Sequence, residues 1–124
     1  MSEQPTFATR LANHVRDHHG DCVVRVGNRV SIVRKLPDDA LEKLVAAGMK
    51  RAISHGLEAE SSIAGFVGAM FRFAPNFDQS EQVRRVLGDT VGTAEERWER
   101  VLSEVGEEEW EGIRRRYDWD AWDG

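Results

Sequence analysis

Imidazole and thiol groups are the side chains most able to do chemistry in this chain, and they are His14, His18, His19, His55 and Cys22. His14 and His18 are four residues apart, a spacing that can place two imidazoles on one metal ion when the segment is helical. A third ligand, from His55 or Cys22, would have to be brought in by the tertiary fold. Val15 stands where a zinc protease carries its glutamate. The pattern favours histidines solvated at a helix end, and we predict no metal site.

Cys22 could act as a nucleophile if His18 or His55 lay beside it, because an adjacent base activates a thiol. It is the only cysteine among 124 residues, and it begins a valine-rich run. A cysteine in such a setting is usually a small buried hydrophobic residue. A thiol-dependent or metal-dependent enzyme is therefore a distant alternative to a binding role.

A run of carboxylates could in principle supply paired general acids and bases. Four glutamates fall within five residues, at Glu107, Glu108, Glu109 and Glu111. Catalytic carboxylates need a pocket that perturbs them, and the sequence indicates none here. The positive end of a helix dipole and a solvated helix face explain the run better. Since there is also no glycine-rich phosphate loop and no nucleophile-elbow motif, we expect a non-enzymatic protein without a cofactor.

Tryptophan and aspartate alternate at the end of the chain, where residues 117–124 read YDWDAWDG. Trp98 and Trp110 fall at positions that should face a core, whereas Trp119 and Trp122 lie beyond the last helical repeat. The pattern leaves open whether one of these two folds back over the bundle. The other would stay exposed within acidic residues, as an aromatic anchor for a partner protein. The predicted partner-binding residues are Trp119, Trp122, Asp118, Asp120 and Asp123, together with Glu107, Glu108, Glu109 and Glu111.

The net negative charge of the chain is concentrated in its C-terminal quarter. Residues 95–124 hold eleven acids against five arginines, whereas residues 1–94 are nearly neutral. The formal net charge of −5 argues against sequence-independent nucleic-acid binding, which depends on cationic side chains. No apolar stretch reaches the length of a membrane span and no export signal is visible, so we expect a cytoplasmic protein. A protein partner with a basic surface fits this balance.

Helical periodicity and breaker residues divide the chain into five or six helices. The expected helices cover residues 6–19, 37–56, 60–73, 78–88, 93–106 and 107–117. Asp78 with Glu81, and Thr93 with Glu96, have the spacing of reciprocal N-terminal caps. Between the first two helices, β-branched runs flank Gly27-Asn28, which predicts a short hairpin over residues 22–34, with an extended linker as the alternative.

The helix expected over residues 60–73 is apolar or small on nearly every side, which is typical of the buried centre of a bundle. Gly65 and Gly68 reduce its helix propensity, a cost that is tolerable where a neighbour must approach the backbone closely. We therefore predict an all-α, single-domain bundle spanning residues 1–124, with this helix surrounded by the others.

Residues 50–102 contain a loose set of turn, cap and core positions: Arg51-Ala52, Gly56-Leu57, Met70-Phe71, Phe77-Asp78, Leu87 and Glu96-Arg97. In these positions the segment resembles small helical proteins encoded beside bacterial type VI secretion genes. The resemblance implies a helical fold and an accessory role in secretion. It carries over no catalytic residues.

These observations favour a protein that binds another protein and performs no catalysis. The resemblance implies an adaptor or chaperone that loads an effector. The alternative is an immunity protein that neutralises a cognate toxin, because an acidic inhibitor suits a basic active site.

Overall fold

The computed structural model describes residues 6–26 and 29–122, and the side chains of Val26 and Trp119 are outside this description. Its elements are α1 (Phe7–His18), β1 (Val23–Val26), β2 (Arg29–Ile32), η1 (Val33–Lys35), α2 (Asp38–Ser54), α3 (Glu60–Arg72), η2 (Phe77–Gln79), α4 (Glu81–Leu87), α5 (Ala94–Glu104), α6 (Glu107–Arg115) and η3 (Trp119–Trp122). Helices dominate the described residues, and the two strands form an antiparallel pair. The predicted all-α bundle with a short hairpin is therefore confirmed. The expected turn residues, Gly27 and Asn28, lie outside the described residues.

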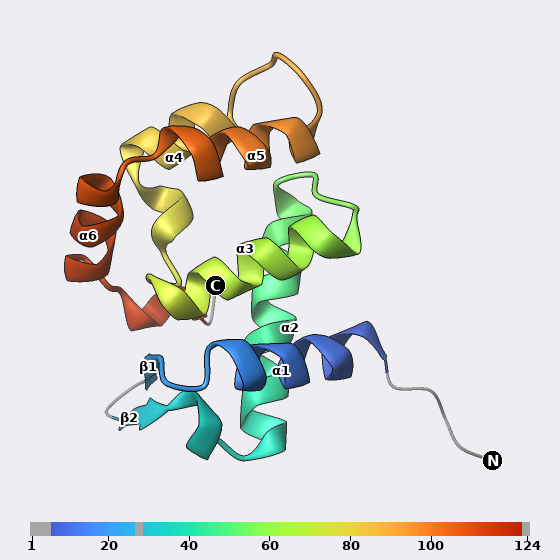
Figure 1. The fold of residues 1–124 in the computed structure, drawn as a ribbon, viewed down its shortest axis with the longest axis vertical. Coiled ribbons are helices and arrows are strands. Elements are labelled where there is room, and N and C mark those ends of the chain that lie inside the picture. Colours follow the sequence, from blue (N-terminus) through green and yellow to red (C-terminus); the bar gives the residue numbers. More distant parts are fainter. Residues whose placement is uncertain (1–5, 27–28, 123–124) are drawn as a thin grey trace.

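The helices form two groups that share α3. In Figure 1, α1 and α3 lie in front of α2, and α4 and α5 run side by side at the opposite end of the molecule. α6 leads from α5 back toward the hairpin, where η3 contacts both β1 and α2. Within the described residues, no helix combines the length and the apolar character that crossing a bilayer requires.

Aromatic side chains from four elements meet at the centre of the core. Phe66 of α3 is fully buried, with ring centroids 4.8 Å from Phe77 and 5.5 Å from Trp98. Trp110 stacks on Phe73 with their centroids 4.3 Å apart. Such ring pairs add about 0.5–1.5 kcal/mol beyond the area that they bury. Trp98 and Trp110 are therefore packing residues, as their helical positions predicted.

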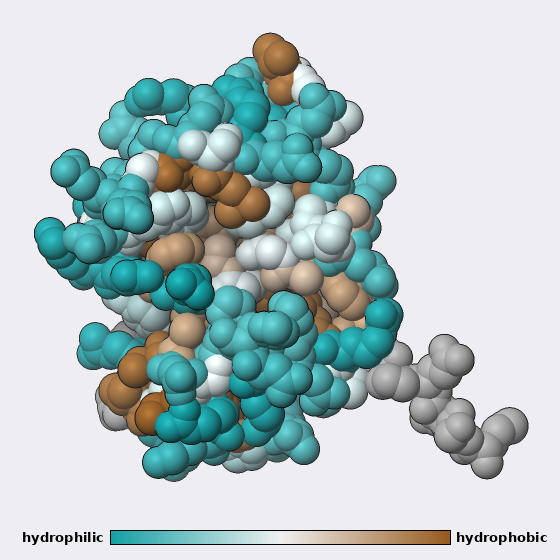
Figure 2. All heavy atoms as spheres, in the orientation of Figure 1, coloured by the Kyte–Doolittle hydropathy of each residue, from teal (hydrophilic) through white to brown (hydrophobic). Residues whose placement is uncertain are grey.

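The predicted burial of α3 holds on one side of the helix only. Phe66, Val67 and Met70 are fully enclosed, but Gly65 is exposed and lines a pocket together with small neighbours of α3. Figure 2 shows a band of small and apolar residues between α1 and α5. A Cβ on Gly65 would lie 3.1 Å from the indole nitrogen of Trp98, and one on Gly68 would lie 3.0 Å from His19 Nε2. The two glycines therefore admit side chains of α5 and of the residue after α1.

One of the two predicted capping pairs is present. Thr93 and Glu96 form the reciprocal capping box at the start of α5. The prediction that Asp78 caps a helix with Glu81 is wrong, because Asp78 lies in η2 and is 5% exposed. α4 begins at Glu81 after Ser80, and no side chain caps it. The Asp78 carboxylate instead forms an ion pair with Arg51 of α2.

The start of α3 is capped from a distance. Its N-cap residue, Ala59, has no side-chain acceptor for the free N–H groups of the first turn. The Glu95 carboxylate of α5 accepts from the backbone N–H of Glu58 at 2.8 Å and from that of Ala59 at 3.3 Å. Ser62 also donates its hydroxyl to Glu95. These hydrogen bonds hold the pKa of Glu95 below its ordinary value, because they favour the charged carboxylate.

Replacing Glu95 by Ala should destabilise the fold by about 1 kcal/mol, the usual cost of a lost helix cap. Urea unfolding followed by circular dichroism measures the change. Glu99→Ala is the matched control, since Glu99 is an exposed glutamate of the same helix. Equal stability of the two variants would show that Glu95 does not cap α3.

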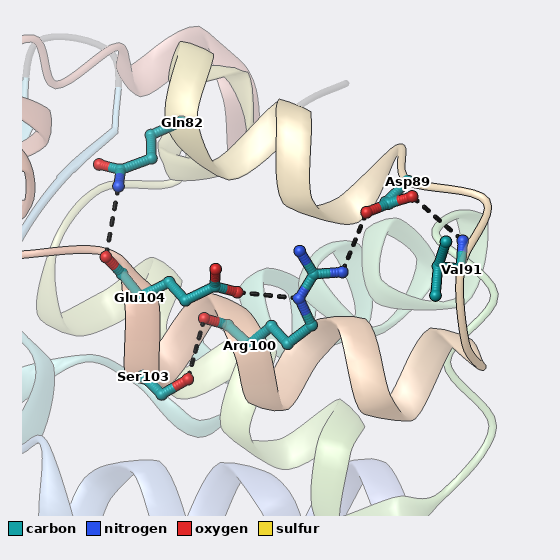
Figure 3. Close-up of polar contacts among 6 residues, drawn as sticks. All are labelled: Gln82, Asp89, Val91, Arg100, Ser103 and Glu104. Carbon is teal, nitrogen blue, oxygen red and sulfur yellow. Dashed lines mark hydrogen bonds and ion pairs between the residues drawn. The ribbon is translucent and has the colours of Figure 1, made fainter.

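Hydrogen bonds and ion pairs join α5 to α4 and to the turn that follows α4 (Figure 3). Arg100 lies between two carboxylates, with Nη1 3.0 Å from Asp89 and Nε 2.8 Å from Glu104. The other oxygen of Asp89 accepts from the backbone N–H of Val91 at 3.1 Å. Gln82 of α4 donates to the backbone oxygen of Glu104 at 3.3 Å. These contacts fix the antiparallel pair that carries Trp98 into the core.

Candidate functional site

The carboxylates at the start of α6 have two different environments. Glu107 and Glu108 are exposed and form no ion pair with a described residue. Glu109 accepts from the Ser80 hydroxyl and lies 3.7 Å from Arg116 Nη2, so it holds α6 against the start of α4. All three lie in the first turn, where the helix dipole favours negative charge.

The dense basic cluster of the sequence is Arg114-Arg115-Arg116, and its side chains contact α6 itself and neighbouring residues. Arg115 pairs with Glu111 one turn earlier, at 3.5 Å. Arg114 lies over the ring of Phe73, with its guanidinium carbon 4.9 Å from the centroid. Because these arginines are engaged, they leave Glu107 and Glu108 without a counter-charge on the surface of α6.

Asn76 holds the chain after α6 in place. Its Nδ2 donates to the backbone oxygen of Arg116 at 2.9 Å, and its Oδ1 accepts from the N–H of Asp118 at 3.0 Å. Asp118 Oδ1 then accepts from the N–H of Asp120 at 3.0 Å, which makes a local turn. The same turn leaves both aspartates exposed.

Trp122 is buried, which corrects the prediction that it belongs to a docking surface. It is 3% exposed, and its ring centroid lies 4.8 Å from that of Phe71. Its indole N–H donates to the Tyr117 hydroxyl at 3.0 Å. Because the apolar ring is covered and the polar N–H is paired, nothing opposes burial of this side chain. Trp122 thus folds back over the bundle.

The other predicted binding residues divide by environment. The side chain of Trp119 and the residue Asp123 lie outside the described residues. Glu109 and Glu111 are engaged in ion pairs. Four carboxylates remain exposed without an ion pair to a described residue, and we name them the acidic face: Glu107, Glu108, Asp118 and Asp120.

The histidines do not converge on one point. The rings of His14 and His18 are 4.3 Å apart between centroids, whereas His19 lies 6.4 Å from His14. His55 is on another part of the molecule, packed 5.4 Å from Phe66. Among residues 6–26 and 29–122, no three His, Cys, Asp or Glu side chains are placed to hold a metal ion.

Burial sets the ionisation of His19 and Cys22. Burial lowers the pKa of His19, and the charges of Arg72 and of the neighbouring histidines lower it further. Burial also raises the pKa of the half-buried Cys22 thiol, and this exceeds the opposing effect of Arg72 and Arg114. Both groups are therefore held in their neutral forms, and a neutral thiol is a poor nucleophile.

A buried ionic cluster joins α2, η2 and the end of the chain. Asp78 Oδ2 lies 2.7 Å from Arg51 Nε and 2.8 Å from His55 Nε2. Arg51 also donates from Nη1 to the backbone oxygen of Ala121 at 3.2 Å. Its side chain is only 14% exposed, so the cluster lies mostly out of water.

The ionisation of Asp78 is decided by opposing effects. Burial by itself raises the pKa of this carboxyl. Hydrogen bonds from His55 and Arg51, aided by their charges, outweigh burial and hold the pKa below its ordinary value. The second oxygen, Oδ1, is buried and accepts no hydrogen bond from a described residue. Asp78 is thus a charged anchor for the segment that contains Ala121.

Sequence reasoning missed this cluster and also missed Asn76. Arg51 and Asp78 both belong to the positions that carried the resemblance to the type VI secretion-associated proteins, where they were interpreted as turn and core positions. Their shared role depends on a contact across 27 residues of chain, which no local pattern encodes. Asn76 follows Pro75, and this pair predicts a loop. It does not show that the Asn76 side chain binds the backbone of Arg116 and Asp118.

The comparisons with other proteins leave the predicted resemblance as a prediction. In the structure, the positions that carry the resemblance lie in helix caps, in the core and in the ion cluster of Asp78, Arg51 and His55. No family model, curated protein or solved structure matches this sequence.

Proposed function

We propose that this protein is a non-enzymatic accessory protein that binds a basic protein surface through its acidic face. The observation that carries the proposal is the set of four exposed carboxylates at the two ends of α6. One pair lies in the first turn of α6 and the other follows its C-terminus; the helix itself is nine residues, or about 13 Å, long, and such a spread suits a protein surface better than a small ligand. Unpaired surface charges of one sign attract a partner of opposite sign and speed its association.

The proposed role is that of an adaptor or chaperone that loads an effector for secretion, as the resemblance implies. A cytoplasmic location is part of the proposal, and the half-buried Cys22 suits a reducing compartment. An immunity protein would use the same acidic face on a basic toxic domain. Deletion separates these roles: loss of an adaptor abolishes effector delivery from a healthy cell, whereas loss of an immunity protein inhibits the producing cell.

Neutralising the acidic face should weaken partner binding at least about tenfold at low salt and leave the fold unchanged. The variant combines Glu107→Gln, Glu108→Gln, Asp118→Asn and Asp120→Asn. Asparagine at position 118 keeps the side-chain oxygen that accepts from the backbone N–H of residue 120. Titration calorimetry against the purified products of the neighbouring genes, at two salt concentrations, measures the affinity.

A matched control removes four exposed acids elsewhere, in Asp17→Asn, Asp39→Asn, Glu58→Gln and Glu99→Gln. It makes the net charge of the protein less negative by the same amount and should retain most of the affinity. If both variants bind with equal affinity, long-range charge alone is responsible and the acidic face has no specific role.

A further inference from the structure

Among the described residues, the two edges of the hairpin differ in whether another segment covers them. On the β1 edge, the N–H of Arg25 donates to the Tyr117 hydroxyl at 3.2 Å, and η3 packs alongside. On the β2 edge, no described strand or segment pairs with the backbone, since the sheet contains only β1 and β2. Within the part of the chain that the structure describes, the C-terminal segment thus covers the β1 edge, and no segment covers the β2 edge.

The register shows which groups face outward from β2. Arg25 pairs with Val30, and the N–H of Arg25 points away from β2 toward Tyr117. Opposite residues of an antiparallel pair share the same hydrogen-bonding state. The N–H and C=O of Val30 therefore point away from β1, and they offer one donor and one acceptor to an additional strand.

A groove of about 830 Å³ lies between β2 and the start of α2. Val24 of β1 and Trp122 contribute to its lining, and Leu36, Ala40 and Leu44 line the side toward α2. Apolar side chains also gather at the hairpin end of the molecule in Figure 2. An open strand edge beside an apolar groove is the arrangement by which proteins bind extended peptides.

The charge around this groove identifies the kind of occupant. Among the described residues, Arg29 and Lys43 are the only charged ones that line it, and neither forms an ion pair with another described residue. A second copy of this chain, added along β2, would bring further cationic side chains toward Arg29, because Arg29 itself recurs and Arg34 and Lys35 follow the strand. Like charges that face one another across strands are destabilising. Acidic residues in the occupant would instead be attracted.

We propose that β2 and α2 bind an extended segment of a partner protein, in which acidic residues flank a short apolar run. Its backbone pairs with Val30, its apolar side chains enter the groove, and its carboxylates meet Arg29 and Lys43. This surface is opposite in charge to the acidic face and shares no residue with it. Either proposal can therefore fail without the other.

The first test uses a labelled synthetic peptide with alternating valine and threonine between glutamates, and a second peptide with lysines in place of the glutamates. Fluorescence anisotropy with the full chain should show binding of the glutamate peptide and at least about tenfold weaker binding of the lysine peptide. Arg29→Glu and Lys43→Glu should each weaken the glutamate peptide about tenfold. Equal affinity of the two peptides, or no binding of either, would overturn the proposal.

The second test addresses the backbone of β2. Val30→Pro removes the outward N–H at a position where an edge strand tolerates proline, and it should weaken the peptide at least about tenfold. Val30→Thr keeps the N–H and should stay within about twofold, since this side chain is 63% exposed. Circular dichroism checks that both variants fold. If Val30→Pro does not fold, a peptide with a methylated backbone nitrogen tests the same hydrogen bonds.

Other occupants give distinct results that would replace this proposal. A concentration-dependent dimer that Val30→Pro disperses would show that a second copy covers β2. Binding of decanoate, without binding of the glutamate peptide, would show that the groove takes a small amphipathic anion. Amide chemical-shift changes confined to residues other than Val24, 29–44 and Trp122 would place the peptide elsewhere on the molecule.

Discussion

Asp78→Ala should lower the free energy of unfolding by about 3–5 kcal/mol, the usual cost of removing one partner from a buried ion pair. The loss leaves Arg51, which is 14% exposed, without its carboxylate and leaves His55 without an acceptor. It also loosens the arginine that holds Ala121. Domains of this kind have about 5–15 kcal/mol of stability in total, so the loss would be a large fraction of it. Urea unfolding followed by circular dichroism measures the change.

Two further variants test the cause of this loss. Asp17→Ala removes an exposed aspartate of α1 and should change stability by less than about 0.5 kcal/mol. Replacing Arg51 and Asp78 together by Met and Leu should recover part of the loss, because no unpaired charge then remains buried. A loss below about 1 kcal/mol for Asp78→Ala would mean that the cluster contributes little to the fold.

The contribution of Asp78 should also depend on pH. Since the pKa of this carboxyl is lower in the folded chain than in the unfolded chain, folding favours the charged form. The resulting stability is present at neutral pH and is lost as the pH falls below about 4, through the folded pKa. The stability difference between the native protein and Asp78→Asn should therefore shrink in acid. A difference that is constant from neutral pH into acid would contradict this account.

Trp122→Ala should destabilise the protein by about 3–5 kcal/mol, because it removes a large ring from the core. The variant loses the contact with Phe71 and the hydrogen bond to Tyr117. It also removes part of the cover over β1. Circular dichroism in urea is the suitable measurement, because the substitution changes the intrinsic fluorescence.

Leu102→Ala provides a comparison in which a large apolar side chain is removed from the surface. Leu102 is 57% exposed, so the change should stay within about 0.5 kcal/mol. Trp122→Phe keeps an aromatic ring and should lose less than Trp122→Ala. If Trp122→Ala kept full stability and lost partner binding, Trp122 would act as a surface anchor after all.

The two largest predicted effects should not be additive. Arg51 pairs with Asp78 and also donates to Ala121, the residue before Trp122. Loss of either anchor should release the same segment of chain, so the double variant should cost less than the two single losses together. A fully additive result would show that the C-terminal segment and the Asp78 cluster unfold independently.

Much of the fold could be predicted because it depends on local patterns. The apolar repeat of α2 and the reciprocal cap of Thr93 and Glu96 each act within a few residues. Glycines and prolines at the helix ends likewise act on their own backbone. The helices and the hairpin were therefore predictable, although Asp78 was misassigned, because the same side chain suits a cap and a buried ion pair.

The candidate surfaces were predictable only in part. The concentration of acid in the last thirty residues is visible in the sequence, and two of its carboxylate pairs do remain exposed. The burial of Trp122 could not be predicted, because it depends on contacts with Tyr117 and Phe71 and on the packing of η3 against β1. The groove along β2 was missed for the same reason, since its walls come from segments that are separate in the chain.

Local patterns in the sequence set the helices, the hairpin and the acidic character of the C-terminal quarter, because propensity, periodicity and charge are properties of neighbouring residues. Contacts between distant segments place Asp78 in an ion cluster with Arg51 and His55 and bury Trp122. Within the described residues, they also leave the edge of β2 unpaired beside a cationic groove. Each of these results depends on the burial of a side chain by a distant segment. Burial changes the free energy of a charge or an aromatic ring by several kcal/mol, which is more than local preference supplies.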